Sequence, residues 1–123
     1  MSNTATKKSA LNINLGGQFH GYKTTPILIN YDTPNTDLNI STPSANQSTL
    51  IIGLSLVSAS AAKITLKSNS TTLTRLELSN NSGIVEEVDM TSPKIICNTA
   101  QGESLKLNCD VILPPFILYI VEV

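Results

Sequence analysis

The chain has 123 residues, a formal net charge of -1 at pH 7 and only 14% charged residues. A chain of this length forms one domain that buries roughly 65% of its unfolded surface. The few cations exclude a basic patch, so we expect neither nucleic acid nor a membrane surface among its partners. Aromatic residues are scarce, tryptophan is absent, and Ser, Thr and Asn are abundant, which is typical of β-structure with a hydroxyl-rich surface.

Residues 1–48 have the composition of an extended N-terminal arm. The stretch Leu11–Leu15 alternates Leu or Ile with Asn and ends at Gly16-Gly17, which predicts a short docked strand. A second short strand is predicted over Ile27–Tyr31, and turn-forming residues follow it. Ordering such an arm costs on the order of 50–100 kcal/mol of backbone entropy. We therefore expect it to be ordered on neighbouring chains, and a disordered tail is the alternative.

Residues 49–123 show period-two alternation of apolar and polar residues, interrupted by turn residues at short intervals. This pattern indicates a series of short strands without a helical run. The predicted strands are Leu50–Val57, Lys63–Lys67, Leu73–Leu78, Ile84–Val88, Lys94–Cys97, Leu105–Cys109 and Phe116–Val123. Strands of this number and spacing predict an antiparallel sandwich or a small barrel.

The final predicted strand is apolar on both of its faces. Alternate residues of a strand point to opposite sides, and a strand with water on one side should alternate with polar residues. We therefore expect the domain's own core to cover one face, and a second sheet or another subunit to cover the other. Pro114-Pro115 is predicted to mark where pairing starts. The predicted oligomer interface is Phe116, Ile117, Leu118, Tyr119, Ile120, Val121 and Val123.

Catalytic and metal-binding patterns are lacking in the sequence. His20 is the only histidine, and no Gly-x-Ser-x-Gly elbow is present. Asp32 and Asp37 could bind calcium but are expected to cap turns. The acidic stretch Glu86–Asp89 is expected to be a solvated strand end. We therefore predict a protein without enzymatic activity, cofactor or bound metal.

Cys97 and Cys109 are the only cysteines. Met1–Leu15 contains no apolar core of a signal peptide, so we expect a reducing compartment. Both thiols are predicted to be reduced and partly buried, although the sequence leaves a bridge between them open.

Three stretches of the chain resemble a family of small bacteriophage virion proteins. These are compact jelly-roll modules, loosely similar to tumour-necrosis-factor trimers, that serve as head decoration or other structural components. The family tends to carry Gly after the first Thr-Thr pair and near residue 114, where this chain has Arg75 and Pro114-Pro115. The matching stretches are Leu54–Ser68 followed by Thr71–Thr74, then Thr99–Asn108 with its Gly-Glu-x-Leu-x-Leu-Asn pattern, and Leu118–Val123.

The resemblance implies an all-β, antiparallel jelly-roll-like β-sandwich over residues 49–123, and the extended N-terminal arm over residues 1–48 is inferred from its composition alone. It further implies a homotrimer on the surface of a virion, assembled in the host cytoplasm, that binds the major capsid protein or neighbouring virion proteins. The alternative is a tail- or surface-associated module that binds carbohydrate or a receptor. The arm's predicted capsid contacts are Leu11, Ile13, Leu15, Phe19, Tyr22, Ile27, Ile29 and Tyr31.

Overall fold

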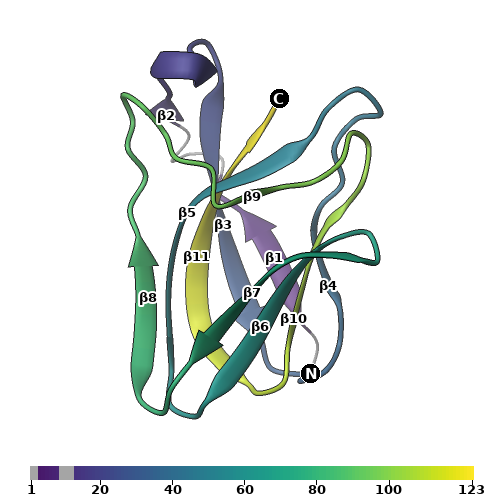
Figure 1. The fold of residues 1–123 in the computed structure, drawn as a ribbon, viewed down its shortest axis with the longest axis vertical. Helices are drawn as coiled ribbons and strands as arrows, with labels where there is room; N and C mark the ends of the chain where they lie inside the picture. Colours follow the sequence, from purple (N-terminus) through teal and green to yellow (C-terminus); the bar gives the residue numbers. More distant parts are fainter. Residues whose placement is uncertain (1–2, 9–12) are drawn as a thin grey trace.

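The computed structural model describes residues 3–8 and 13–123 (Figure 1). Apart from one short 3-10 turn, the regular elements of these residues are strands. They are β1 (Thr4–Lys7), β2 (Ile13–Asn14), η2 (Gly17–Phe19), β3 (Lys23–Tyr31), β4 (Leu38–Ser41), β5 (Thr49–Ser58), β6 (Ala62–Ser68), β7 (Thr71–Leu78), β8 (Ser82–Glu86), β9 (Cys97–Asn98), β10 (Leu105–Cys109) and β11 (Leu113–Glu122).

The strands form two antiparallel sheets that pack face to face (Figure 1). The seven-stranded sheet has the order β1-β3-β11-β5-β8, with β2 also paired to β3 and β9 to β5. The four-stranded sheet has the order β4-β10-β6-β7. The pairs are nested, because β3 pairs with β11, β4 with β10, β5 with β8 and β6 with β7. A long hairpin rolled up in this way is a jelly roll, so the predicted all-β, jelly-roll-like sandwich is confirmed.

The main core lies between the two sheets and is built from alternate residues of their strands. In the four-stranded sheet, β6 and β10 alternate fully buried residues with partly exposed ones. Their inward residues Ile64, Leu66 and Leu105 meet Leu118 and Ile120 of β11 within the same apolar cluster. Burying each such side chain contributes about 1.5–3 kcal/mol. The period-two pattern of the sequence therefore decides which residues face this core.

Residue 48 is not a boundary between an arm and a domain, contrary to the sequence-based prediction. β3 is nine residues long and lies between β1 and β11 in the seven-stranded sheet. Its residues Ile27 and Ile29 have no exposed surface. β4 likewise belongs to the four-stranded sheet. The described residues before Lys23 also pair with β3 of the same chain, through β1 and β2.

Pro26 explains why β1 and β2 are separate strands along the same edge of β3. β1 pairs with β3 from Ile27 onward, and β2 pairs with Lys23 and Thr24. The carbonyl of Pro26 accepts a hydrogen bond from the backbone N–H of Lys8 at 2.8 Å. In an antiparallel ladder, the N–H and the carbonyl of one residue point to the same neighbouring strand, so the residue at position 26 would also donate an N–H to Lys8. Proline has no N–H to donate. The ladder along this edge therefore stops at Pro26.

Two other strands have different bounds in the structure from those predicted from the sequence. Of the stretch predicted over Lys94–Cys97, only Cys97 lies in a strand, and it pairs with Ile51 of β5. β11 begins at Leu113, ahead of Pro114-Pro115. Its register against β3 shifts across these prolines, which lie exposed in a bulge. Residues without an N–H are tolerated there because a bulge leaves them unpaired.

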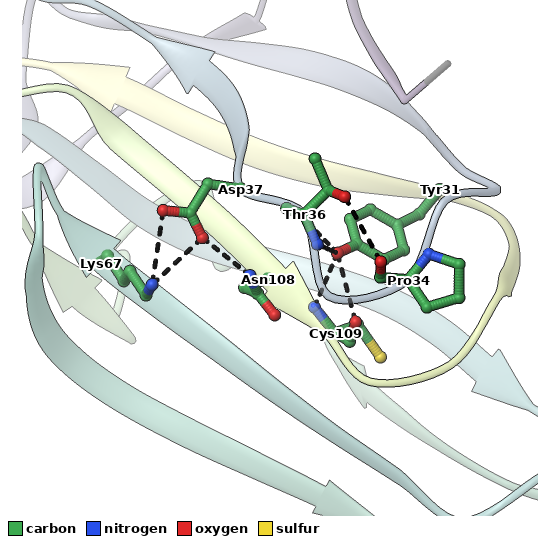
Figure 2. A network of polar contacts seen from close by, with 7 residues as sticks. All are labelled: Tyr31, Pro34, Thr36, Asp37, Lys67, Asn108 and Cys109. Carbon is green, nitrogen blue, oxygen red and sulfur yellow. Dashed lines mark hydrogen bonds and ion pairs between the residues drawn. The ribbon is translucent and has the colours of Figure 1, made fainter. Parts of the chain in front are cut away.

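A buried tyrosine ties the β3–β4 connection to β10 (Figure 2). The hydroxyl of Tyr31 donates to the carbonyl of Thr36 at 2.6 Å and accepts the backbone N–H of Cys109 at 2.9 Å. Beside it, Asp37 accepts hydrogen bonds from Asn108 at 2.8 Å and from Lys67 at 3.1 Å. These bonds fix an otherwise irregular connection onto the four-stranded sheet.

Candidate interaction surface on the outer sheet face

The predicted interface strand β11 is a central strand of the seven-stranded sheet, between β3 and β5. Phe116, Leu118 and Ile120 face the four-stranded sheet and are buried in the main core. These three residues cannot form a contact between subunits, which corrects that part of the prediction. The sequence pattern could not separate the two faces, because both of them are apolar.

The opposite face of this sheet, called the outer face here, is covered at one end by the chain itself. Leu15, Phe19, Leu50, Ile52 and Val121 form a second buried cluster there. We call it the outer cluster, and its partly buried members are Val88, Met90, Tyr119 and Val123. Figure 1 shows η2 beside the β8–β9 connection, the two segments that supply this cover.

Two glycines allow η2 to lie against that connection. The backbone N–H of Gly16 donates to the carbonyl of Met90 at 2.7 Å. Gly17 has a φ of +61°, and a Cβ added to it would lie 2.7 Å from the carbonyl oxygen of Thr91. With this cover, Val121 is only 1% exposed. The prediction of another subunit over the second face is therefore wrong at this end, since the chain supplies the cover.

The rest of the outer face is not covered by the chain, and its middle carries uncharged side chains. Ile117 lies opposite Leu28 of β3 and Ser55 of β5, and Ser55 lies opposite Val85 of β8. Val57 and Val85 are 57% and 64% exposed. We call these five residues the outer strip. Large exposed apolar side chains on adjacent strands mark an interaction surface.

A shallow hollow of about 350 Å³ lies at the border between the outer strip and the outer cluster. The chain passes close to Gly53 here, because a Cβ on that residue would lie 2.5 Å from Cγ2 of Val88. The hollow combines an apolar lining with two exposed carboxylates and one phenol. It is lined by Leu54, Ser55, Val85, Glu86, Glu87, Val88, Met90 and Tyr119.

A second apolar depression lies at the end of the sandwich where β10 turns into β11. Ile112 in this turn is 59% exposed. The depression has a volume of about 530 Å³, and we call it the end groove. It is lined by Asn30, Tyr31, Asp32, Ala59, Ile112, Leu113, Pro114 and Pro115.

Most of the predicted arm contacts are interior residues. Leu15 and Phe19 belong to the outer cluster, and Ile27, Ile29 and Tyr31 belong to the main core. They are therefore unavailable for contacts with a capsid. Tyr22 is exposed, and Ile13 pairs through its backbone with Thr24. Leu11 lies outside the described residues.

Two of the acidic residues singled out in the sequence, Asp37 and Asp89, accept hydrogen bonds from neighbouring groups. Asp37 is engaged by Asn108 and Lys67, whose hydrogen bonds lower the pKa of its carboxyl group. Asp89 caps its own turn by accepting hydrogen bonds from Thr91 and Ser92, which lowers its pKa. Among residues 3–8 and 13–123, no group of three or more His, Cys, Asp or Glu side chains is placed to hold a metal ion. In the same residues, no helix is long and apolar enough to cross a membrane.

Both cysteines are free and buried, as predicted. Burial raises the pKa of the Cys97 thiol to about 11, and it also raises the pKa of Cys109. A thiol with a raised pKa is a poor nucleophile, because the thiolate is the reactive form.

Comparisons with known proteins show no family for this chain. No protein-family model matches the sequence, and no curated protein matches it either. Among solved structures, the cupin domain of Cnp3 from Schizosaccharomyces pombe is similar, with 8% sequence identity and a TM-score of 0.31. The alignment covers 90% of this chain and 58% of that one. A TM-score this low supports no inference about function.

Proposed function

We propose that the protein is a non-enzymatic structural component of a bacteriophage virion. More specifically, we propose that it is a homotrimeric decoration or cement protein that stabilises the head by binding several major capsid subunits. The observation that carries it is the outer strip, a row of uncharged side chains that are exposed or partly exposed on one face of the sheet. A surface of this kind suits a contact with protein rather than with nucleic acid or lipid.

The family resemblance is compatible with this fold. The three resembling stretches are distant in sequence but neighbours in the sandwich. Leu54–Ser68 spans the second half of β5 and all of β6, and Leu118–Val123 includes the end of β11, where it pairs with the first half of β5 and with Leu54. Thr99–Asn108 includes the part of β10 that pairs with β6. The stretches therefore contribute paired strands to both sheets, which supports reading them as parts of one module.

A trimeric cement protein needs two surfaces, one for its own copies and one for the capsid. We assign the outer strip to contacts between copies and the end groove with Ile112 to contacts with capsid protein. Binding to the assembled shell, but not to dissociated subunits, stabilises the shell by mass action. Specific protein interfaces bury about 1,200–2,000 Å² of total surface, and we expect each of these contacts to bury an area of that size.

The first test is the solution mass of the protein at micromolar concentration. We expect a trimer for the wild type and a shift toward the 13.1 kDa monomer for Val85→Glu. The variant should weaken assembly at least about tenfold, because it buries an unpaired carboxylate in the contact. Ile95→Glu is the matched control, since Ile95 is also exposed but lies outside the outer strip. A wild-type monomer, or equal effects of both substitutions, contradicts the proposed trimer.

The second test separates capsid binding from trimer formation. Ile112→Glu should reduce binding to phage heads and leave the solution mass unchanged, whereas Val85→Glu should lower the solution mass. Cryo-microscopy of intact particles should then show the protein on the head surface. Density on the tail, or its absence from the particle, contradicts a decoration role.

Carbohydrate or receptor binding is the second candidate function. The hollow favours it, because Tyr119 offers a ring for stacking, and Glu86 and Glu87 offer carboxylates for sugar hydroxyls. A glycan array distinguishes the two functions. Specific binding that is lost in Tyr119→Ala would favour this reading over a cement role.

A further inference from the structure

β7 ends the four-stranded sheet and pairs with β6 along one side only (Figure 1). It has eight residues, whereas the other strands that end a sheet, β1, β4 and β8, have four, four and five. Among the described residues, β7 makes no hydrogen bond outside its pairing with β6. Its open side therefore presents unpaired backbone donors and acceptors, to which another strand can add.

The regular part of β7 comprises residues 74–78. These five residues pair one for one with residues 62–66 of β6, and the register shifts beyond Thr74. An irregularity of this kind bends a strand, so a further strand can pair regularly with β7 over these five residues only. The segment contains neither proline nor glycine, the residues that interrupt pairing at a sheet edge.

The side chains of residues 74–78 divide into an apolar row and a charged pair. Leu76 and Leu78 point to the core side of the sheet, where Leu78 is buried and Leu76 is partly buried. Arg75 and Glu77 point to the other side and are exposed. Among the described residues, neither of these two charges forms an ion pair.

We propose that β7 pairs antiparallel with β7 of a second copy, about a twofold axis that passes beside Leu76. In this register, Arg75 of each copy lies opposite Glu77 of the other, and the two Leu76 side chains lie opposite each other. Opposite charges at directly opposed positions stabilise a strand pair. Because Leu76 is the centre of residues 74–78, every residue of the regular segment then has a partner.

The order of the charges along β7 selects this register over its neighbours. An axis beside Arg75 or beside Glu77 places that residue opposite its own copy, which sets like charges together. Parallel pairing in register has the same result. A slip by one residue instead turns the apolar row of the second copy to the outside of the sheet. The surface of β7 is therefore complementary to itself in one arrangement.

This inference goes beyond the proposed function, because it adds a twofold contact in the sheet that does not carry the outer strip. A contact of five residue pairs is at the small end of interface sizes, so we expect a weak dimer in solution. Copies held together on one surface would pair more strongly, because their effective concentration is higher. In the proposed assembly, the contact would join one trimer to the next.

The test reverses the two charges in a Val85→Glu background, in which the proposed contact through the outer strip is disrupted. Arg75→Glu places like charges at both charged pairs of the twofold contact, and so does Glu77→Arg. An equal mixture of these two variants restores opposite charges at both pairs, as does the double variant Arg75→Glu/Glu77→Arg. Sedimentation equilibrium at concentrations up to about 1 mM measures the association.

We expect the background protein to form a dimer at twice the 13.1 kDa chain mass. Each single variant alone should associate about tenfold more weakly, and the mixture and the double variant should recover the association. Lys106→Glu is the matched control, because it reverses a charge on the central strand β10 of the same sheet and should leave the dimer unchanged.

Two results would overturn the proposal. One is the absence of a dimer at every concentration of the background protein, and the other is a mixture that associates no better than its two components. Neither result bears on the trimer, which the solution mass of the protein without Val85→Glu tests separately.

Discussion

The phenolic oxygen of Tyr31 in β3 lies 2.9 Å from the backbone nitrogen of Cys109 at the end of β10. It therefore links the two sheets, because β3 belongs to one and β10 to the other. The same hydroxyl also donates to Thr36 in the connection to β4. One side chain thus holds three segments together, and its bond to Cys109 is buried.

We expect Tyr31→Phe to lower the free energy of unfolding by about 1–3 kcal/mol, because it leaves the buried backbone N–H of Cys109 without a partner. The ring itself would still fill the core. Urea denaturation measures the change, and Tyr22→Phe at an exposed position is the control, for which we expect almost no effect. Equal stability of the two variants would show that the hydroxyl contributes nothing.

Asp37 should make stability depend on acid pH. Its pKa is lowered from 3.8, chiefly by the hydrogen bond from Asn108 and further by Lys67. A group whose folded pKa is depressed stabilises the protein above its unfolded pKa, and this contribution disappears as the pH falls through the folded value. Because Asp37 is exposed, we expect Asp37→Asn to cost less than about 1 kcal/mol at neutral pH. Wild type and variant should converge in acid, as unfolding titrations would show, and a constant difference across pH would contradict this assignment.

Both thiols should resist modification in the native protein. Burial raises the pKa of Cys97 to about 11, so the thiolate fraction at mildly alkaline pH is small. We expect iodoacetamide to label neither cysteine until denaturant is added, and mass spectrometry would report the labelling. Rapid labelling of the folded protein would mean that these sites open readily.

The docking of η2 can be tested with a matched pair of glycines. Gly17 and Gly21 both have positive φ, but a Cβ would meet Thr91 only at Gly17, with nothing within 4 Å at Gly21. Both alanine variants carry the backbone penalty, whereas Gly17→Ala adds the clash. We expect Gly17→Ala to lose about 1 kcal/mol more than Gly21→Ala and to speed hydrogen exchange of the Gly16 amide. If the two variants behave alike, the contact with the β8–β9 connection is not close.

Strands in which apolar and polar residues alternate clearly, such as β6 and β10, could be predicted from the sequence. The length of β3 was not, because Pro26 and its neighbouring threonines weaken the apolar signal of Lys23–Tyr31. β4 has only four residues between turn-forming segments, so its place in a sheet depends on β10.

The candidate surface was predictable only in part. The pattern of β11 indicated two covered faces, which is correct for the core face and for one end of the outer face, but it could not show that η2 provides the second cover. Of the outer strip, Ile117 was among the predicted interface residues, but Val57 and Val85 were missed, because they have the sequence signature of buried strand residues. Their exposure follows from which side of the sheet the four-stranded layer occupies, and that depends on the topology of the whole chain.

The central place of β11 also constrains the order in which the protein can fold. A nascent chain that has not yet released Leu113–Glu122 from the ribosome leaves facing edges of β3 and β5 unpaired, because that segment lies between them. The seven-stranded sheet can therefore close only at a late step, when β11 inserts between its neighbours. Pairings this distant in sequence make slow folding the expectation, and stalled or truncated chains would present two open edges to each other.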